Sequence, residues 1–226
     1  MIYANVSPAM FFSRPNRFIA HARLGDDMIT CHVKNTGRCK ELLTPGATVY
    51  VQRTDNSLRK TQYDLIAVRK GRRLINMDSQ APNRVFREHL QNGQYIDSIT
   101  RIKPEAKFGG SRFDFYVEAG ERKIFIEVKG VTLEEDGVVL FPDAPTERGV
   151  RHLRELIRCA AAGYEAHVVF VVQMSDVRYF TPNDATHPAF GEALRAAAAA
   201  GVKVVALDCA AEPDRLEIGK EIPIKL

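Results

Sequence analysis

Alternating apolar and polar residues predict short β-strands throughout the first eighty residues. The side-chain period of a strand is two, so one face is apolar and the other polar. Turn residues such as Gly25-Asp26-Asp27 and Thr44-Pro45-Gly46 separate the alternating segments. The expected strands are Arg17–Leu24, Met28–Lys34, Thr48–Thr54, Tyr63–Arg69 and Arg72–Met77. Five such strands predict a small OB-like β-barrel, and a small SH3-like barrel fits the same pattern.

From Ala81 onward, helical and strand periodicities alternate. Pro82 suits the first turn of a helix whose less polar stripe includes Val85, Phe86 and Leu90. The expected strands are Arg112–Glu118, Lys123–Lys129, Val138–Phe141, His167–Met174 and Val202–Asp208, and the later helices are Glu147–Ala162 and Ala189–Ala200. This order predicts a mixed α/β sheet flanked by helices. The chain is therefore expected to form two domains, residues 1–80 and 81–226.

Charge is distributed unevenly between these two parts. Residues 1–80 hold 13 Lys and Arg against 6 Asp and Glu, a balance of +7. The remainder holds 19 basic and 22 acidic residues, a balance of −3, which gives the net charge of +4. A basic barrel favours contact with a polyanion such as DNA, and a solvated basic surface is the alternative.

Composition and motifs exclude several classes of protein. The hydrophobic share of 45%, with 15 Gly and 11 Pro, is that of a globular chain rather than a disordered or collagenous one. We expect no membrane span, no secretory leader and no nucleotide cofactor, since the motifs for each are missing. The four cysteines form no CxxC pair, so we expect buried thiols in a cytoplasmic protein; they are Cys31, Cys39, Cys159 and Cys209.

The segment Ser111–Gly130 is the most informative part of the chain. Gly120-Glu121 suits the two-residue loop of a type II′ hairpin, which would place Asp114 directly opposite Glu127. Alternation then assigns one face to apolar residues, namely Phe113, Phe115, Val117, Ile124, Ile126 and Val128. The other face would hold Arg112, Asp114, Glu127 and Lys129.

Two carboxylates directly opposed on neighbouring strands destabilise a sheet unless something compensates their charge. A divalent cation, Mg²⁺ or Mn²⁺, held by Asp114 and Glu127 would do so, because Mg²⁺ typically binds one or two carboxylates. Lys129 would then orient a water or stabilise charge on a phosphate. The alternative is a surface ladder in which Arg112 and Lys129 neutralise the two carboxylates.

These residues carry a resemblance to known proteins. The RFDF and IEVKG segments, in this order of strands and helices, resemble the PD-(D/E)xK nuclease-like core. In that group Asp114, Glu127 and Lys129 would be the catalytic residues, and the two carboxylates would be metal ligands. Glu88, on the preceding helix, matches the position of an additional acidic ligand, and an exposed glutamate is the other interpretation.

The chain as a whole resembles the sugar fermentation stimulation proteins. The matching segments are Arg14–Phe18, His32–Arg38, Leu43–Gly46, Ser111–Asp114, Glu127–Gly130 and Phe141–Ala144, with Arg148 and His152. The resemblance implies an OB-like domain, a nuclease-like domain, and non-specific DNA binding linked to the regulation of sugar (maltose) use. It does not decide whether DNA is cut.

The function therefore has three candidate interpretations. The first is non-specific DNA binding through the basic barrel, and the second is a Mg²⁺- or Mn²⁺-dependent DNA phosphodiesterase. The third is a protein-interaction module with an inactive nuclease core. Arg148 and His152 share one face of their helix by their spacing, opposite its apolar stripe. The residues expected to contact nucleic acid are Arg17, Lys34, Arg38, Arg112, Arg148 and His152.

Overall fold

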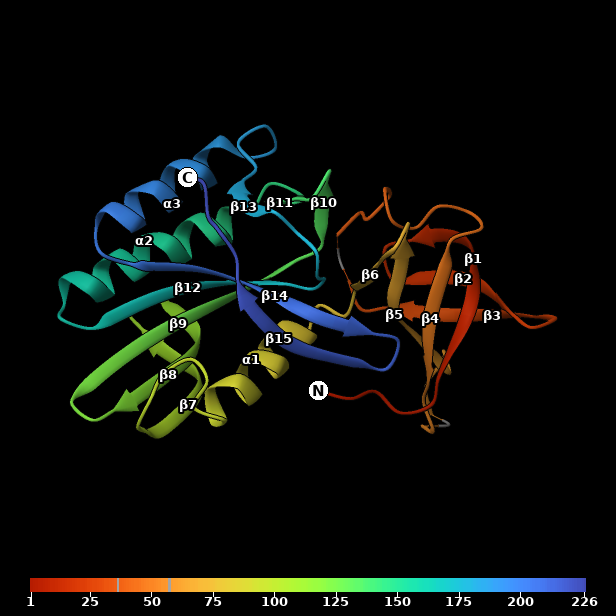
Figure 1. The fold of residues 1–226 in the computed structure, drawn as a ribbon, viewed down its shortest axis with the longest axis horizontal. Helices are drawn as coiled ribbons and strands as arrows, with labels where there is room; N and C mark the ends of the chain where they lie inside the picture. The colour runs from red at the N-terminus through yellow and green to blue at the C-terminus, as the bar shows by residue number, and fades with distance from the viewer. Residues whose placement is uncertain (36, 57) are drawn as a thin grey trace.

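The first part of the chain forms a six-stranded sheet that closes into a barrel (Figure 1). The computed structural model describes residues 1–226 except Thr36 and Ser57. The strands are β1 (Val6–Asn16), β2 (Ile19–Leu24), β3 (Asp27–Val33), β4 (Thr48–Arg53), β5 (Tyr63–Lys70) and β6 (Arg73–Asn76). Their order is β3-β2-β1-β4-β5-β6, and a parallel pairing of β3 with β5 closes a five-stranded barrel. The predicted OB-like barrel is confirmed.

The barrel contains one strand, β1, that the sequence pattern did not predict. The sequence pattern missed β1, because Pro8 and Pro15 are residues that strands usually lack. Burial nevertheless alternates along β1, with Ala9 and Phe11 buried and Phe12 exposed. The expected fifth strand, β6, instead extends the sheet beyond β5.

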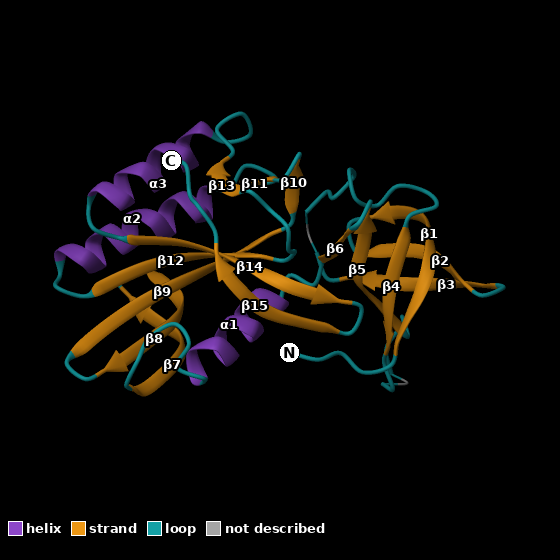
Figure 2. Ribbon diagram, in the orientation of Figure 1, coloured by secondary structure: helices purple, strands orange, loops and turns teal. Residues whose placement is uncertain are grey.

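The second part of the chain is a mixed sheet between helices (Figure 2). Its strands, in sheet order, are β15 (Arg215–Glu221), β14 (Lys203–Glu212), β12 (Glu165–Val172), β9 (Arg122–Val131), β8 (Ser111–Ala119) and β7 (Ile99–Phe108). The central strands β9, β12 and β14 are parallel. Helices α2 (Glu147–Ala161) and α3 (Pro188–Ala199) cover one face and α1 (Ala81–Gln91) the other, so β12 is buried on both faces, as predicted.

Several elements of this domain escaped the sequence pattern. The segment that forms the edge strand β7 was expected to be a loop. Most of its residues are exposed in the structure, so its sequence shows little alternation of apolar and polar residues. The segment Val138–Phe141 is a strand, β11, but it lies outside the central sheet. It pairs with β10 (Leu133–Glu135) and β13 (Tyr179–Pro182) in a separate three-stranded sheet. The terminal strand β15 was also not predicted.

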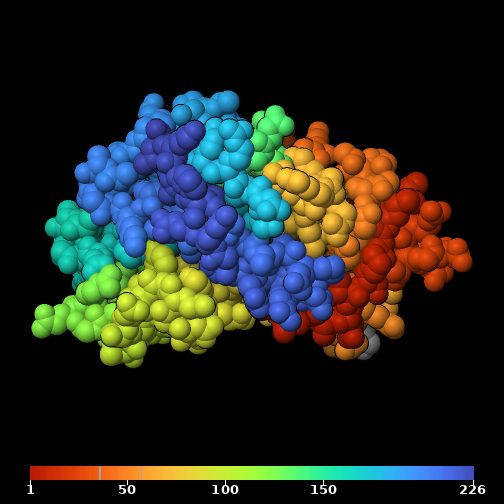
Figure 3. All heavy atoms as spheres, viewed as in Figure 1, coloured from red at the N-terminus to blue at the C-terminus, as the bar shows by residue number. Residues whose placement is uncertain are grey.

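The two parts of the chain are in contact over a broad area (Figure 3). The main chain of Met1 exchanges hydrogen bonds with Leu216 of β15, so the first residues of the chain add to the second sheet. A second contact between the two parts joins β5 and β6 to β10. Lys70 and Arg73 bind the buried carboxylate of Glu134 at 2.8 and 2.9 Å. The four cysteines are buried thiols. No helix within the described part of the chain is long and apolar enough to cross a membrane.

Candidate functional site

Asp114 ends the pairing between β8 and β9. The hairpin turns at Gly120, whose φ of 60° is the conformation that the predicted turn requires, and pairing runs from Ala119 with Arg122 to Phe115 with Ile126. Beyond that point the Asp114 carboxylate accepts the backbone N–H of Val128 at 2.8 Å. Its other oxygen accepts a hydrogen bond from the side-chain amide of Asn83, on α1, at 2.7 Å. The predicted register is therefore correct up to Phe115.

The change at Asp114 also alters which face Phe113 occupies. The prediction placed Phe113 on the same face as Phe115, but the structure packs it against the α2 side of the sheet, with its ring centroid 6.0 Å from that of His152. This prediction was wrong because alternation holds only while both strands stay regularly paired. Here a side-chain carboxylate takes a hydrogen bond of the main-chain ladder.

Glu127 is buried and binds two cationic or polar groups through one oxygen. Its Oε1 lies 2.5 Å from Nζ of Lys129 and 2.5 Å from Nδ1 of His152. Its Oε2 is buried and has no hydrogen-bond partner among the residues that the structure describes. A buried carboxylate oxygen without a partner is costly. The arrangement thus leaves one oxygen of Glu127 available to a further ligand.

His152 is not the exposed phosphate contact that its spacing predicted. Its side chain is 4% exposed and lies on the buried face of α2. Nε of Arg148 donates to Nε2 of His152 at 3.4 Å, because arginine can only donate. Nε2 is therefore the accepting nitrogen of the ring, and we assign the ring proton to Nδ1, which donates it to Glu127. Arg148 itself is exposed at the start of α2, so its predicted contact with nucleic acid remains sterically open.

The two carboxylates have opposite pKa shifts. Burial raises the pKa of Asp114 to about 6, and the nearby Glu127 charge adds to this shift. Burial also opposes ionisation of Glu127, but the hydrogen bond from His152 and the charge of Lys129 outweigh it and lower the pKa of Glu127. One group that ionises readily beside one that resists ionisation is a common feature of functional sites.

The donor set fits a hard divalent cation. No group of three or more His, Cys, Asp or Glu side chains suited to a metal occurs among the described residues, so the site offers two carboxylates rather than a closed cage. Mg²⁺ is commonly held by one or two carboxylates and completes its shell with water and substrate oxygens. The unpartnered Oε2 of Glu127 beside the partly buried Asp114 satisfies that requirement.

Two other predicted site residues have different surroundings. Glu88 forms an ion pair of 2.7 Å with the amino group of Met1, and among the described contacts none links it to Asp114 or Glu127. Its assignment as a third metal ligand gains no support from this position. Arg112 is 57% exposed and lies 3.5 Å from the carboxylate of Glu105, on the neighbouring strand β7.

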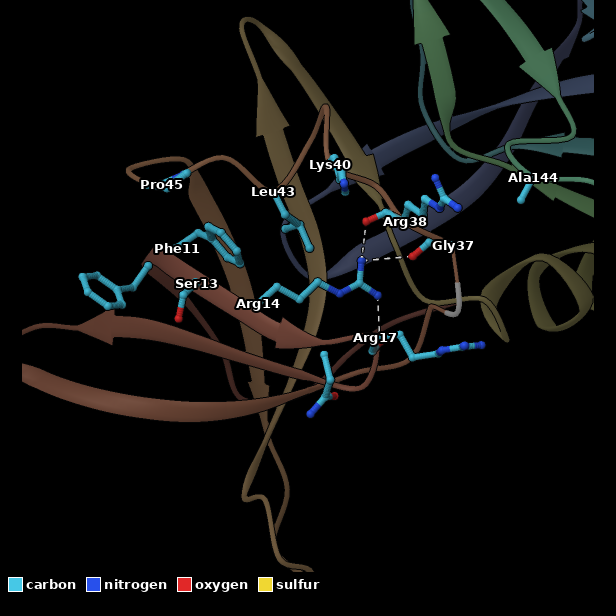
Figure 4. A pocket seen from close by; sticks show the side chains of 12 residues that line it. Phe11, Ser13, Arg14, Arg17, Gly37, Arg38, Lys40, Leu43, Pro45 and Ala144 are labelled. Carbon is cyan, nitrogen blue, oxygen red and sulfur yellow. Dashed lines mark hydrogen bonds between the residues drawn. The ribbon is translucent and has the colours of Figure 1, made fainter. Parts of the chain in front are cut away.

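The barrel separates the predicted cations into two groups. Lys34 is 22% exposed and pairs with the buried Asp64 at 2.8 Å, so its ammonium has a structural partner. Its role in DNA contact stays a prediction, and the pairing with a buried carboxylate does not favour it. Arg17 and Arg38 are exposed and line a hollow of about 590 Å³ (Figure 4). Thr36, in the same predicted loop, lies outside the described residues.

Sequence reasoning missed the residue that organises this hollow. Arg14 donates to four backbone carbonyl oxygens, at 2.7–3.0 Å, and so joins the end of β1 to the loop that follows β3; the acceptors are Arg17, Asn35, Gly37 and Arg38. The aromatic residues of the barrel made base stacking possible from the sequence but did not indicate it, and the structure exposes two of them, Phe12 by 56% and Phe18 by 51%. The alternation of β1 would have indicated that Phe12 points outward while Phe11 points inward, had β1 been predicted.

Comparison with known proteins covers both parts of the chain. The family model described as the SfsA N-terminal OB domain matches residues 12–77, and the one described as the sugar fermentation stimulation protein RE domain matches residues 80–215. Sugar fermentation stimulation protein homologs from Desulfitobacterium hafniense and Ruminiclostridium cellulolyticum are 61% and 54% identical over all 226 residues, covering 99% and 100% of those proteins. A solved structure described as Pyrococcus furiosus SfsA in complex with Ca²⁺ is 28% identical, with a TM-score of 0.91 over 100% of this chain and 98% of that one.

Proposed function

We propose, from the membership of this chain in the sugar fermentation stimulation protein family, that it binds DNA without sequence specificity and holds Mg²⁺ or Mn²⁺ in its α/β domain. DNA binding is supported by one observation above all. Arg17, Arg38 and Lys40 line one hollow of the barrel and form no ion pairs among the described residues. Unpaired surface cations of this kind bind phosphates without reading sequence. The proposal places the protein in the cytoplasm.

The metal is assigned to Asp114 and Glu127. The support is the buried, unpartnered Oε2 of Glu127, whose other oxygen is fixed by Lys129 and His152. The Pyrococcus furiosus relative is described as bound to Ca²⁺, a cation that also takes oxygen ligands. A divalent ion held here would supply Lewis-acid stabilisation of a phosphate.

A second candidate function is hydrolysis of a phosphodiester at this site. It is favoured by Lys129, whose ammonium lies 2.5 Å from Glu127 and whose side chain is 15% exposed. A cation there can neutralise charge that develops on a phosphate or orient an attacking water. Plain DNA binding requires neither the buried carboxylate pair nor this lysine.

Binding and hydrolysis are separated by one set of measurements. Fluorescence anisotropy of a labelled 30-nucleotide DNA, in EDTA and increasing KCl, should show an affinity that falls steeply with salt, by a log–log slope of about −0.7 for each phosphate contact on a single strand. Incubation of the same DNA with Mn²⁺ should yield cleavage that Asp114→Asn and Lys129→Met both abolish. Binding without cleavage by the wild type would reject the second candidate, and no binding at low salt would reject the first.

A further inference from the structure

The hollow on the barrel combines exposed aromatic and cationic side chains in one place (Figure 4). We call it the aromatic groove, and it is defined by Phe12, Arg17, Arg38, Lys40 and Ala144, above a floor that includes Arg14. Phe12 is 56% exposed within the groove. Phe18, which follows the lining residue Arg17 in the chain, is 51% exposed, and the Arg17 guanidinium is 5.9 Å from the centre of its ring. Large apolar side chains exposed next to cations mark a binding surface more often than an isolated exposed residue does.

The charged residues that line the groove are all basic. Its described lining includes Arg14, Arg17, Arg38 and Lys40 and contains no Asp or Glu. The Arg14 guanidinium is occupied by backbone carbonyl groups, but the other three cations project from the surface without acidic partners in the described chain. A polyanion is therefore the complementary partner, and an apolar peptide is not.

The described residues of the groove are held together by hydrogen bonds within the chain. Four hydrogen bonds from Arg14 join the end of β1 to the loop after β3. On the other side of that loop, the Asp143 carboxylate lies so close to Gly37 that a Cβ there would collide with it. A surface held in this way loses little conformational entropy on binding, which favours affinity.

The groove reaches the α/β domain at one edge. Ala144, which lines its edge, belongs to the α/β domain and precedes α2 by three residues. Arg148, in the first turn of α2, contacts His152, and His152 contacts Glu127. A helix rises about 1.5 Å per residue, so Arg148 and His152 are separated by only about 6 Å along the axis. A chain of phosphates leaving the groove past Ala144 would next meet Arg148.

We infer that the aromatic groove binds single-stranded DNA by stacking bases on Phe12 and Phe18, and that it directs the strand toward the carboxylate site. This inference rests on the proposed DNA binding and specifies its substrate. In a duplex the bases are stacked on one another and present only their edges in the grooves, which leaves the two phenylalanines without a partner. In a single strand every base offers a face to an aromatic ring, while phosphates meet the cations.

The test compares single-stranded and duplex DNA of one length. A labelled 15-nucleotide strand of mixed sequence and its duplex are titrated with wild-type protein by anisotropy, in EDTA at low salt. We expect the single strand to bind at least tenfold more tightly than the duplex. Phe12→Ala and Phe18→Ala should each weaken binding of the single strand by roughly fivefold or more, from the usual strength of base–aromatic stacking, without changing the salt slope. Tyrosine at either position should restore affinity.

Matched controls separate stacking from general damage. Met28→Ala removes another exposed apolar side chain of the barrel, 56% exposed but outside the groove, and should leave affinity unchanged. Arg53→Ala removes an exposed cation outside the groove and should change neither affinity nor slope, whereas Arg17→Ala should flatten the slope. Thermal unfolding of each variant confirms that it is folded.

The outcomes distinguish this inference from the proposed function. Equal binding of duplex and single strand, with unchanged affinity in both alanine variants, would overturn the groove as a single-strand site while leaving non-specific DNA binding intact. Wild-type protein that binds neither form would overturn the proposed DNA binding itself. An RNA strand of the same sequence bound more than tenfold tighter than DNA would overturn the assignment to DNA.

Discussion

His152 and Glu127 are 25 residues apart in the chain, yet Nδ1 of the histidine lies 2.5 Å from Oε1 of the carboxylate, and both side chains are 4% exposed. This contact joins α2 to β9 at the point where the candidate metal site is formed. It fixes one oxygen of Glu127 together with Lys129, while Oε2 has no partner within the described part of the chain. His152 is therefore placed to position the carboxylate, and its burial does not favour the predicted contact with phosphate.

The first prediction concerns this contact. His152→Ala should lower the free energy of unfolding by about 1–3 kcal/mol, because it removes a partner from a buried carboxylate. His152→Asn should recover part of the loss, since its amide can place an N–H donor near the position of Nδ1. Urea unfolding measures both, with the exposed Arg154→Ala on the same helix as control. A loss in His152→Ala no larger than in Arg154→Ala would refute the role.

The second prediction is a dependence of stability on pH in EDTA. The pKa of Asp114 is about 6 in the folded chain, above its ordinary value of 3.8, so the folded state holds this proton more tightly than the unfolded state. The resulting stabilisation is complete below about pH 4 and is lost as pH rises through 6, by at most about 3 kcal/mol. Relative to Asp114→Asn, the wild type should therefore lose stability between pH 4 and 7. Urea unfolding at four pH values checks this, and a relative gain over that range would contradict it.

The third prediction separates the two groups of barrel cations. Lys34→Met should lower the free energy of unfolding by about 1–2 kcal/mol, since it removes a partner of the buried Asp64, whose pKa is lowered because Arg59 and Lys34 outweigh burial. It should leave the salt dependence of DNA binding unchanged. Arg17→Ala combined with Arg38→Ala should do the reverse, with stability within about 0.5 kcal/mol of wild type and a flatter salt slope. Urea unfolding and anisotropy together measure both effects, and a flatter slope in Lys34→Met would contradict the assignment.

The hairpin of β8 and β9 shows what the sequence pattern can predict. Gly120 at a two-residue loop and strict alternation determine the register, and that register holds from Ala119 to Phe115. The pattern fails at Asp114, because a carboxylate that binds the main chain of Val128 competes with the ladder, and no periodicity describes such a bond. Asp114 is near enough for the charge of Glu127 to raise its pKa, but the two residues do not form the predicted strand pair. Their partners Asn83 and His152 come from helices whose packing the pattern does not contain.

The surroundings of His152 illustrate the same limit. Its helix was assigned one apolar stripe, which left His152 on the opposite, polar face. In the structure α2 packs on both the sheet and α3, so its buried arc is wider than that stripe and includes His152 and Glu155. A pattern of apolar residues predicts the middle of the buried face of a helix. It does not predict how wide that buried face is, because the width depends on how many other elements pack against the helix. The aromatic groove also depends on the contacts of Arg14 with residues up to 24 positions away.

The measurement that tests the central assignment most directly is thermal unfolding with and without Mn²⁺. A ligand that binds only the folded state at one hundred times its Kd stabilises it by about 2.7 kcal/mol, a Tm increase of roughly 5–10 °C for a chain of this size. The wild type should show this increase, Asp114→Asn should show almost none, and Lys129→Met should keep most of it. An equal increase in wild type and Asp114→Asn, or none in either, would contradict a divalent-cation site at Asp114 and Glu127.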